Sequence, residues 1–181
     1  MRKPKAFVER VTELSDIDLH DLCEATDVAI IDGGGFGWLK PPPRRTLEAY
    51  WRGVLLVPER ELFVARLDGV ACGSAQLVKS PRNNEAQRYL AHMQSEFVAP
   101  WARGHGLARM LVESVEARAR AEGLRTLNLD VRETQVAAIK LYESLGFTHW
   151  GTHPHYARVR GQDVAGLFFY KELSRRREAE S

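Results

Sequence analysis

The chain has 181 residues, and its 26 Lys plus Arg against 24 Asp plus Glu leave a formal net charge of only +2. This balance argues against a dedicated nucleic-acid binder, which usually carries a clustered basic face and a larger positive excess. With 44% hydrophobic and 28% charged residues, the composition is that of a globular domain rather than of a disordered or collagen-like chain.

The cysteines and the hydropathy pattern further restrict the class of protein to which the chain can belong. Cys23 and Cys72 lie far apart in the sequence and form no CxxC pair, which argues against the common zinc and redox motifs and favours a reducing compartment. Apolar runs such as Val54 to Val57 fall far short of the roughly 20 residues that span a bilayer. The basic N-terminus is interrupted at Phe7-Val8-Glu9-Arg10, unlike a secretory signal. We expect a cytoplasmic protein that binds neither membrane nor nucleic acid.

Periodicity and turn residues predict alternating strands and helices in one domain. Ser15, with Asp18 three residues later, predicts a capped helix start, and Asp68-Gly69 is a strong hairpin signal. In chain order, we expect a strand at 6–14, a helix from 15 to about 30, a short helix near 47–53, strands at 61–67, 70–79 and 88–98, a helix at 104–122, a strand at 124–131, a helix at 134–145 and a final pair of strands between 147 and 173. We assign residues 1–173 to this domain and expect residues 174–181 to be a disordered tail.

A glycine-rich loop, Asp32-Gly33-Gly34-Gly35-Phe36-Gly37-Trp38, follows the first helix. It does not match a Walker phosphate loop, because Lys40 is not followed by Ser or Thr and no strong strand precedes the run. We interpret it as a mobile loop between helices. Its aromatic residues Phe36 and Trp38 are candidates to cover a small-molecule site, since long glycine-rich loops often act as lids.

The most informative segment joins a strand directly to a helix: Val98-Ala99-Pro100-Trp101-Ala102-Arg103-Gly104-His105-Gly106-Leu107-Ala108. A helix N-terminus carries about half a positive charge and free N–H donors, and glycine lets a diphosphate approach the backbone without meeting a Cβ. An anion-binding turn is one interpretation of this segment, and a tight strand-to-helix turn is the other.

Two motifs taken together narrow this choice. The pattern Arg103-x-x-Gly106-x-Ala108, followed by Ala138-x-x-x-Tyr142-x-x-x-Gly146-Phe147, resembles the GNAT acetyltransferase superfamily. The resemblance is strongest over residues 94–147 and extends, through the order of the elements, over nearly the whole chain. Four further segments are similar to the tabtoxin-resistance type of small-molecule acetyltransferase, namely Asp32-Gly33-Gly34, Tyr50-Trp51, Ala75-Gln76-Leu77 and Phe168-Phe169-Tyr170-Lys171.

The resemblance implies an α/β (α+β) fold with a mixed, mostly antiparallel sheet of about seven strands, helices on both faces, and the fourth and fifth strands splayed around the cofactor. It implies acetyl-CoA with its pyrophosphate on the turn and its pantetheine between the splayed strands, paired with the backbone of Val98. Gln135 stands where the family commonly has Asn, so a contact to CoA is expected to be lost or rearranged there. The residues that the resemblance assigns to the cofactor are Val98, Ala99, Arg103, Gly104, His105, Gly106, Leu107, Ala108, Gln135, Ala138 and Tyr142.

Three residues are candidates for the base that takes a proton from the attacking amine. His92 is the first, because imidazole titrates near neutrality without tuning and because it stands where related acetyltransferases place their base. Glu96 is the rival, or an anchor for a cationic substrate, since burial would raise its pKa. Asp130 is the third, because it would face the strand 88–98 across the splay.

A period of two divides the side chains of the strand 88–98 between its two faces. It places Tyr89, Ala91, Met93 and Phe97 on an apolar face of that strand, and Arg88, His92, Gln94 and Glu96 on the other.

Tyr142 matches the family tyrosine that protonates the departing CoA thiolate, and the alternative is a helix tyrosine that packs on the sheet. Our candidates for binding the acceptor are Phe36, Trp38, Gln94 and Tyr156. His149, His153 and His155 share a strand parity, but Pro154 interrupts the ladder and no acidic or cysteine partner follows at ligand spacing, so we expect no metal.

Three functions remain open from the sequence. The first is acetyl-CoA-dependent transfer of an acetyl group to a primary amine of a small molecule by direct attack. The second is a protein or peptide N-acetyltransferase, which would require an open peptide groove. The third is a CoA-binding sensor without catalysis, against which His92, Glu96 and Tyr142 together argue. The sequence predicts neither the acceptor nor the choice between monomer and homodimer.

Overall fold

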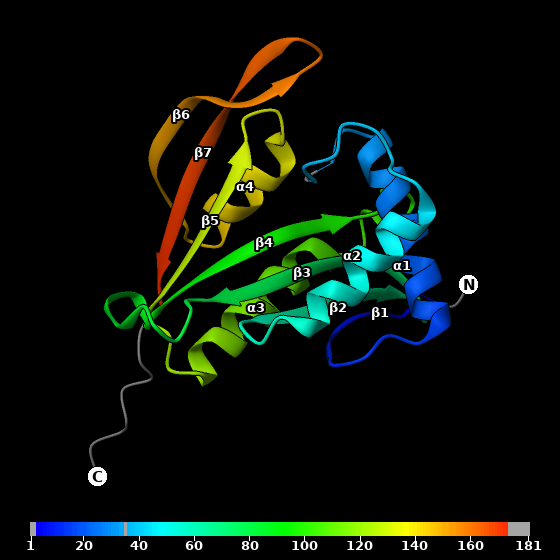
Figure 1. The fold of residues 1–181 in the computed structure, drawn as a ribbon, viewed down its shortest axis with the longest axis horizontal. Coiled ribbons are helices and arrows are strands. Elements are labelled where there is room, and N and C mark those ends of the chain that lie inside the picture. The colour runs from blue at the N-terminus through cyan, green and yellow to red at the C-terminus, as the bar shows by residue number, and fades with distance from the viewer. Residues whose placement is uncertain (1–2, 35, 174–181) are drawn as a thin grey trace.

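A computed structural model describes residues 3–34 and 36–173, so the predicted tail at 174–181 lies outside the described residues. Within this part of the chain, seven strands form one sheet in the order β1-β2-β3-β4-β5-β7-β6 (Figure 1). Neighbouring strands are antiparallel except for β4 and β5, which are parallel. This sheet confirms the predicted fold class.

The strands are β1 (Ala6–Val11), β2 (Arg60–Leu67), β3 (Val70–Lys79), β4 (Leu90–Val98), β5 (Thr126–Arg132), β6 (Thr148–Val159) and β7 (Gln162–Glu172). The helices are α1 (Asp16–Ile31), α2 (Arg44–Leu56), α3 (Leu107–Ala121) and α4 (Val136–Ser144), with short 3-10 turns at Glu85–Gln87 and Pro100–Ala102. α2 is longer at both ends than the predicted helix 47–53.

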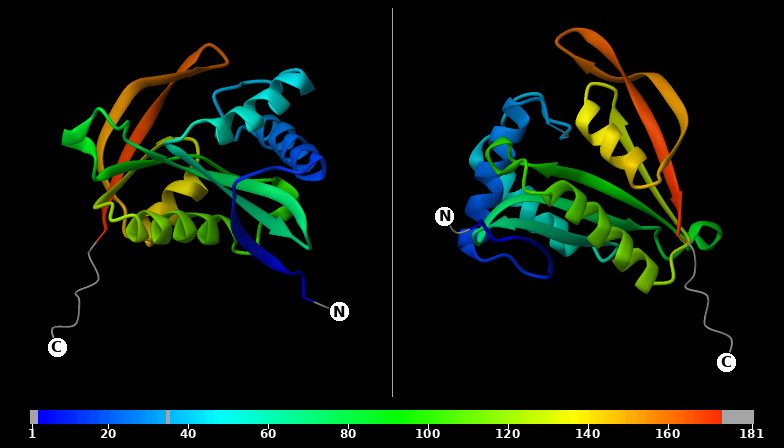
Figure 2. Two further views of the ribbon diagram at one scale, coloured as in Figure 1. Left: turned by 60° about the horizontal axis from the view of Figure 1, so that its bottom comes forward. Right: turned by 180° about the vertical axis from the view of Figure 1, so that it is seen from behind.

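Helices cover both faces of the sheet (Figure 2). α1 and α2 lie on one face, and α3 and α4 lie on the other. Each layer encloses its own apolar core: Trp51 and Phe97 belong to the core under α1 and α2, whereas Leu111 and Tyr142 belong to the core under α3 and α4. Among the described helices, none is long and apolar enough to cross a membrane.

The short-range signals in the sequence are confirmed. The Ser15 hydroxyl accepts a hydrogen bond from the Asp18 N–H at 3.1 Å, which caps α1. Asp68 and Gly69 form the turn between β2 and β3 with φ angles of 50° and 91°, a backbone region that glycine favours and aspartate tolerates. These local contacts fix where the elements begin and turn.

The parallel pair β4–β5 is joined over only part of its length. Residues 90–92 of β4 pair with residues 126–128 of β5, and β5 then continues alongside β7 as far as Arg132. The two strands therefore diverge toward their C-terminal ends (Figure 1). This divergence confirms the predicted splay and opens the sheet beside Glu96.

A β-bulge reverses the predicted alternation of β4. Ser95 has a φ of 52°, and the register of β4 against β3 shifts between Ser74 and Gln76. An inserted residue moves the side chains that follow it to the other face. Phe97, which we predicted on the face of Met93, therefore lies in the core under α1 and α2, whereas Met93 lies in the core under α3 and α4. That prediction was wrong because a strict period of two does not register an inserted residue.

Candidate active site

The divergence of β4 and β5 creates a cleft of about 1220 Å³. The α1–α2 loop, the second half of β4, the turn before α3, the end of β5, α4 and a part of β6 line it. The predicted site residues among its lining are Phe36, Gln94, Glu96, Val98, Arg103, Gly104, Gly106, Leu107, Ala108, Asp130, Gln135, Ala138, Tyr142 and Tyr156. Trp38, His92, Ala99 and His105 are not among the lining residues.

The turn before α3 has a backbone geometry that glycine favours. Gly104 and Gly106 have φ angles of 82° and 76°, which residues with a Cβ rarely adopt. The N–H of Met110 donates to the Gly106 carbonyl oxygen at 3.1 Å, so the N–H groups that precede Met110 in α3 have no partner within the helix. The start of α3 thus lines the cleft with N–H donors and the positive end of the helix dipole, an arrangement that suits a diphosphate.

Ala99 and His105 shape this turn from outside the cleft. The N–H of Ala99, which is fully buried, donates to the Cys72 carbonyl oxygen at 2.7 Å. The Nδ1 atom of His105 lies 3.2 Å from the Ala102 carbonyl oxygen and 3.1 Å from that of Arg103. Both residues therefore support the backbone of the turn through contacts with protein atoms.

Arg132 fastens the α1–α2 loop to the opposite wall of the cleft. Its guanidinium, at the end of β5, donates hydrogen bonds to the carbonyl oxygens of Gly34 and Phe36 at 2.7 and 3.0 Å. Sequence reasoning missed Arg132, because no local pattern marks a contact between residues 98 positions apart. The arginine determines where the Phe36 backbone lies over the cleft.

Two residues predicted to contact the cofactor also hold this loop. Gln135 donates to the Gly33 carbonyl oxygen at 2.6 Å, and Arg103 forms an ion pair with Asp32 at 2.7 Å. The loop, the turn and the start of α4 are therefore joined across the mouth of the cleft.

Glu96 and Tyr142 meet in the cleft between β4 and α4. The Tyr142 hydroxyl donates a hydrogen bond to the Glu96 carboxylate at 2.9 Å. Burial raises the pKa of Glu96 to about 7, against the opposing effect of the Tyr142 hydrogen bond. Burial and the adjacent Glu96 charge raise the pKa of Tyr142 well above its usual value. Near neutral pH, Glu96 can accept a proton, whereas Tyr142 holds one.

A second carboxylate, Asp130 on β5, is held by Tyr156. The Tyr156 hydroxyl donates a hydrogen bond to Asp130, and burial together with this partner raises the pKa of Tyr156 to about 12. The pairing of β6 with β7 is irregular between His153 and Ala157. The Tyr156 ring lies against Gly166 of β7, where an added Cβ would collide with the ring. Sequence reasoning missed Gly166, which leaves the space that Tyr156 fills.

His92 lies apart from the Glu96–Tyr142 pair. It is exposed and lines a second hollow of about 410 Å³, which also contains Asn128 and aromatic residues of β6 and β7. Asp130 lines both the cleft and this second hollow. Of the three candidate bases, the structure joins Glu96 to Tyr142, places Asp130 between the two cavities, and separates His92 from the cleft.

The candidates for acceptor binding differ in their positions. Phe36 and Gln94 line the cleft, whereas Trp38 stacks on Phe36 with ring centroids 6.2 Å apart. Phe36 is also a core residue, because its ring centroid lies 4.9 Å from that of Phe97 and the residue is 6% exposed. Trp38 therefore supports the aromatic wall that Phe36 contributes.

The histidines of β6 contact other protein groups. The Nδ1 atom of His155 lies 2.6 Å from the Asp163 carboxylate, and the Nε2 atom of His149 lies 3.0 Å from the Thr152 hydroxyl. Within the described residues, no group of three or more His, Cys, Asp or Glu side chains is placed to hold a metal ion.

Comparison with known proteins identifies the family to which this fold and cleft correspond. Residues 21–147 match the model of the Acetyltransferase (GNAT) family. The chain belongs to this family. It is 65% identical over 128 residues to an uncharacterized N-acetyltransferase in the hisH-hisA intergenic region of Azospirillum brasilense, which covers 71% of this chain and 76% of that protein. It is 35% identical over 121 residues to the IAA acetyltransferase of Azospirillum brasilense, which covers 66% of this chain and 72% of that protein.

Solved structures share the fold. An N-acetyltransferase from Staphylococcus aureus Mu50 aligns with a TM-score of 0.80 at 24% identity, over 94% of this chain and 99% of that one. A GNAT superfamily phosphinothricin acetyltransferase from Sinorhizobium meliloti, in complex with AcCoA, aligns with a TM-score of 0.77 at 22% identity, over 93% of this chain and 89% of that one. The protein is thus a GNAT N-acetyltransferase that uses acetyl-CoA, and the resemblance predicted from the sequence is confirmed.

The protein backbone around the cleft is suited to binding acetyl-CoA. A Cβ built at Gly104 meets no atom within 4 Å, so the turn has open space in front of it, and the first N–H groups of α3 would hold the pyrophosphate. Because the pairing with β5 involves residues 90–92 of β4, the rest of that edge, including Val98, is not paired with β5, and its backbone groups would suit the pantetheine amides.

Replacing Gly106 with valine is expected to weaken CoA binding about tenfold or more, because a β-branched residue at a φ of 76° distorts the turn and displaces the N–H donors of α3. Calorimetric titration with CoA measures this effect. Gly123→Val is the matched control: Gly123 has a φ of 75° and open space for a Cβ at the other end of α3, so it should lower stability and leave CoA affinity intact. Unchanged affinity in Gly106→Val would contradict the assignment of the turn.

Proposed function

We propose that this N-acetyltransferase acetylates a primary amine of a small molecule by direct attack of the amine in a ternary complex with acetyl-CoA. The observation that carries the proposal is the hydrogen-bonded pair of Glu96 and Tyr142, which lies in the same cleft as the glycine turn. Acetyl-CoA supplies an activated acetyl thioester. The protein supplies position and proton transfer.

Glu96 accepts the proton that the amine must lose. An ammonium ion has no free electron pair with which to attack, and a carboxyl group with a pKa of about 7 is a base suited to neutral pH. A partly buried carboxylate that lines the cleft also attracts the cationic form of the amine into place. We therefore favour Glu96 over His92 as the base.

Tyr142 holds the proton that the departing sulfur needs. Its raised pKa keeps the phenol protonated, and its hydrogen bond to Glu96 allows the proton taken by Glu96 to pass to Tyr142 as Tyr142 gives up its own. In the overall reaction a C–N bond forms and a C–S bond breaks. The ammonium nitrogen loses two protons, of which one goes to solvent and the other reaches the sulfur through Glu96 and Tyr142. The pair returns to its starting state after each turnover.

The α1–α2 loop favours a small acceptor. Its backbone is fastened to β5 by Arg132 and to α4 by Gln135, and Phe36 lines the cleft beneath it. A peptide acceptor would need an open groove at this place, and the loop would first have to give up these hydrogen bonds. A sensor without catalysis would have no use for a titrating carboxyl group next to a buried tyrosine.

A panel of acceptors tests the proposed function. Purified protein with acetyl-CoA is expected to release free CoA in the presence of at least one small primary amine and not with peptides that carry a free N-terminus or a lysine. The release is read with a thiol reagent against a control without acceptor. Release with peptides alone would favour the peptide alternative, and CoA binding without release to any acceptor would favour the sensor.

A further inference from the structure

The second hollow is lined by polar and aromatic residues that have no role in the proposed reaction. Its lining residues come from β4, β5, β6 and β7, and α1 and α2 do not cover β5, β6 and β7 (Figure 1). The register supports this placement, because Asn128 pairs with both His92 and Tyr170. The residues that line the second hollow are His92, Thr126, Asn128, Leu129, Asp130, Trp150, Phe168, Phe169 and Tyr170.

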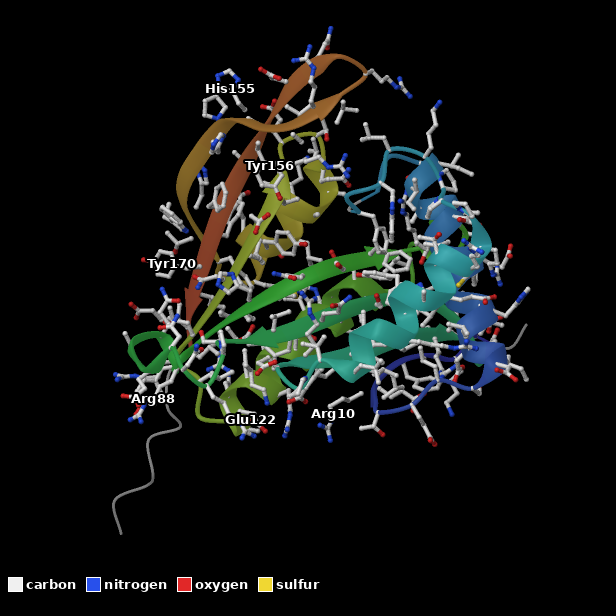
Figure 3. All side chains as sticks on the ribbon, viewed as in Figure 1. Arg10, Arg88, Glu122, His155, Tyr156 and Tyr170 are labelled. Atoms are coloured by element: carbon white, nitrogen blue, oxygen red, sulfur yellow. The ribbon has the colours of Figure 1, made fainter. Side chains whose placement is uncertain are left out.

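Aromatic rings form one wall of this hollow. The Phe168 ring centroid lies 5.8 Å from that of Trp150 and 5.9 Å from that of Tyr156. Trp150 is 64% exposed. Figure 3 shows Tyr156 toward the β6–β7 turn and Tyr170 toward the other end of β7. Exposed aromatic faces attract cations, because the face of the ring carries the negative part of its quadrupole.

The charged side chain that lines the hollow also favours a cationic ligand. Asp130 lines it, and the described lining residues include neither Lys nor Arg. Tyr156, seated on Gly166, donates its hydroxyl to Asp130 and so fixes the direction of the carboxylate while Asp130 remains exposed. The Asp130 carboxylate disfavours an anionic ligand here and attracts a cationic one. An organic cation satisfies both the carboxylate and the rings.

The two cavities are adjoining parts of one surface. Leu129 and Asp130 line the second hollow and also the cleft that contains Glu96. One molecule can therefore place an amine beside Glu96 and a second group beside Asp130.

We propose that the second hollow binds a cationic group, an ammonium or a guanidinium, carried by the same acceptor whose amine is acetylated beside Glu96. This inference rests on the proposed function and narrows it to amines that bear a second positive charge. Asp130 and Trp150 then determine acceptor specificity, Asp130 by charge and Trp150 by its ring face.

Calorimetry with hexamethonium tests the hollow without relying on catalysis. This dication has two quaternary ammonium groups and no N–H bond, so it cannot be acetylated. We expect it to bind the CoA-loaded protein, with affinity reduced about two- to fivefold by Asp130→Asn and about two- to fivefold by Trp150→Ala. Glu143→Gln, which removes the same charge from an exposed position on α4, is the matched control and should leave the affinity unchanged. Absence of binding to the wild type, or equal affinity in Asp130→Asn, would overturn the proposal.

A kinetic comparison links the hollow to the acceptor. We expect kcat/KM for 1,6-diaminohexane to exceed that for hexylamine by about tenfold or more, and the ratio of the two to fall toward one in Asp130→Asn. An equal kcat/KM for the two amines in the wild type would overturn the inference and leave the proposed function standing. Failure of both amines and of the whole panel would refute the proposed function, while hexamethonium binding would still report on the hollow.

Discussion

Glu96→Gln is expected to lower kcat by about 10²- to 10⁴-fold, the range for loss of a general base. Glutamine keeps the size and an oxygen that can accept the Tyr142 hydrogen bond, but it cannot take a proton from the amine. Because deprotonated Glu96 is the active form, the wild-type rate should rise with pH through about 7, the pKa that burial gives this carboxyl group. Glu96→Gln should lack this acidic limb.

Initial rates between pH 5.5 and 9 measure both effects, and thermal melting shows whether the variant is folded. His92→Ala is the control, because His92 is exposed and lies in the second hollow. It should keep the acidic limb that Glu96→Gln loses. If His92→Ala abolished the limb and Glu96→Gln retained it, the role of base would belong to His92.

The local part of this site could be predicted from the sequence, because its signals act over a few residues. A glycine needed at a positive φ marks the turn before α3, and Gly104 and Gly106 both adopt one. The same holds for Asp68-Gly69 between β2 and β3. The order of strands and helices follows from such signals together with hydrophobic periodicity.

The choice of base depended on side-chain direction, and there the sequence was not sufficient. The bulge at Ser95 shifts the register of β4, and the serine in that position has no property that requires a left-handed backbone. The period of two grouped His92 with Glu96, whereas the structure separates the two residues into different cavities. Bulges arise from the fit between strands, so they follow from tertiary packing rather than from local preference.

Contacts between distant segments of the chain account for the remaining differences between the predictions from the sequence and the structure. Arg132 binds Phe36 across 96 positions, and Tyr156 reaches Asp130 across 26. Only the topology of the sheet, with β7 inserted between β5 and β6, brings Tyr156 next to Gly166 and Asp130. A polar residue at the end of a strand predicts that a site is near, but not which loop it contacts.

Tyr142→Phe separates proton transfer from packing. The ring lies 6.0 Å from that of Phe147 and 6.2 Å from that of Phe169 between centroids, and phenylalanine preserves these contacts, so the melting temperature should change little. Without the hydroxyl, the departing sulfur loses its proton donor, and kcat should fall about 10- to 10²-fold. The hydrogen bond from Tyr142 also lowers the pKa of Glu96, so its removal should move the acidic limb of the pH profile to higher pH. A residue that only packs would produce neither this shift, which reports the hydrogen bond, nor the fall in kcat above the limb, which reports the proton transfer.

The pH profile of Tyr142→Phe therefore decides between the two roles, with Tyr89→Phe as the control because the Tyr89 side chain is 41% exposed and outside the cleft. The control should keep the wild-type rate and the wild-type limb. Full activity with an unmoved limb in Tyr142→Phe would show that Tyr142 only packs on the sheet. A fall in rate that is matched by a fall in melting temperature, with the limb unmoved, would show a structural effect. A reduced rate at normal stability, with the limb moved upward, is the outcome that the hydrogen bond between Tyr142 and Glu96 requires.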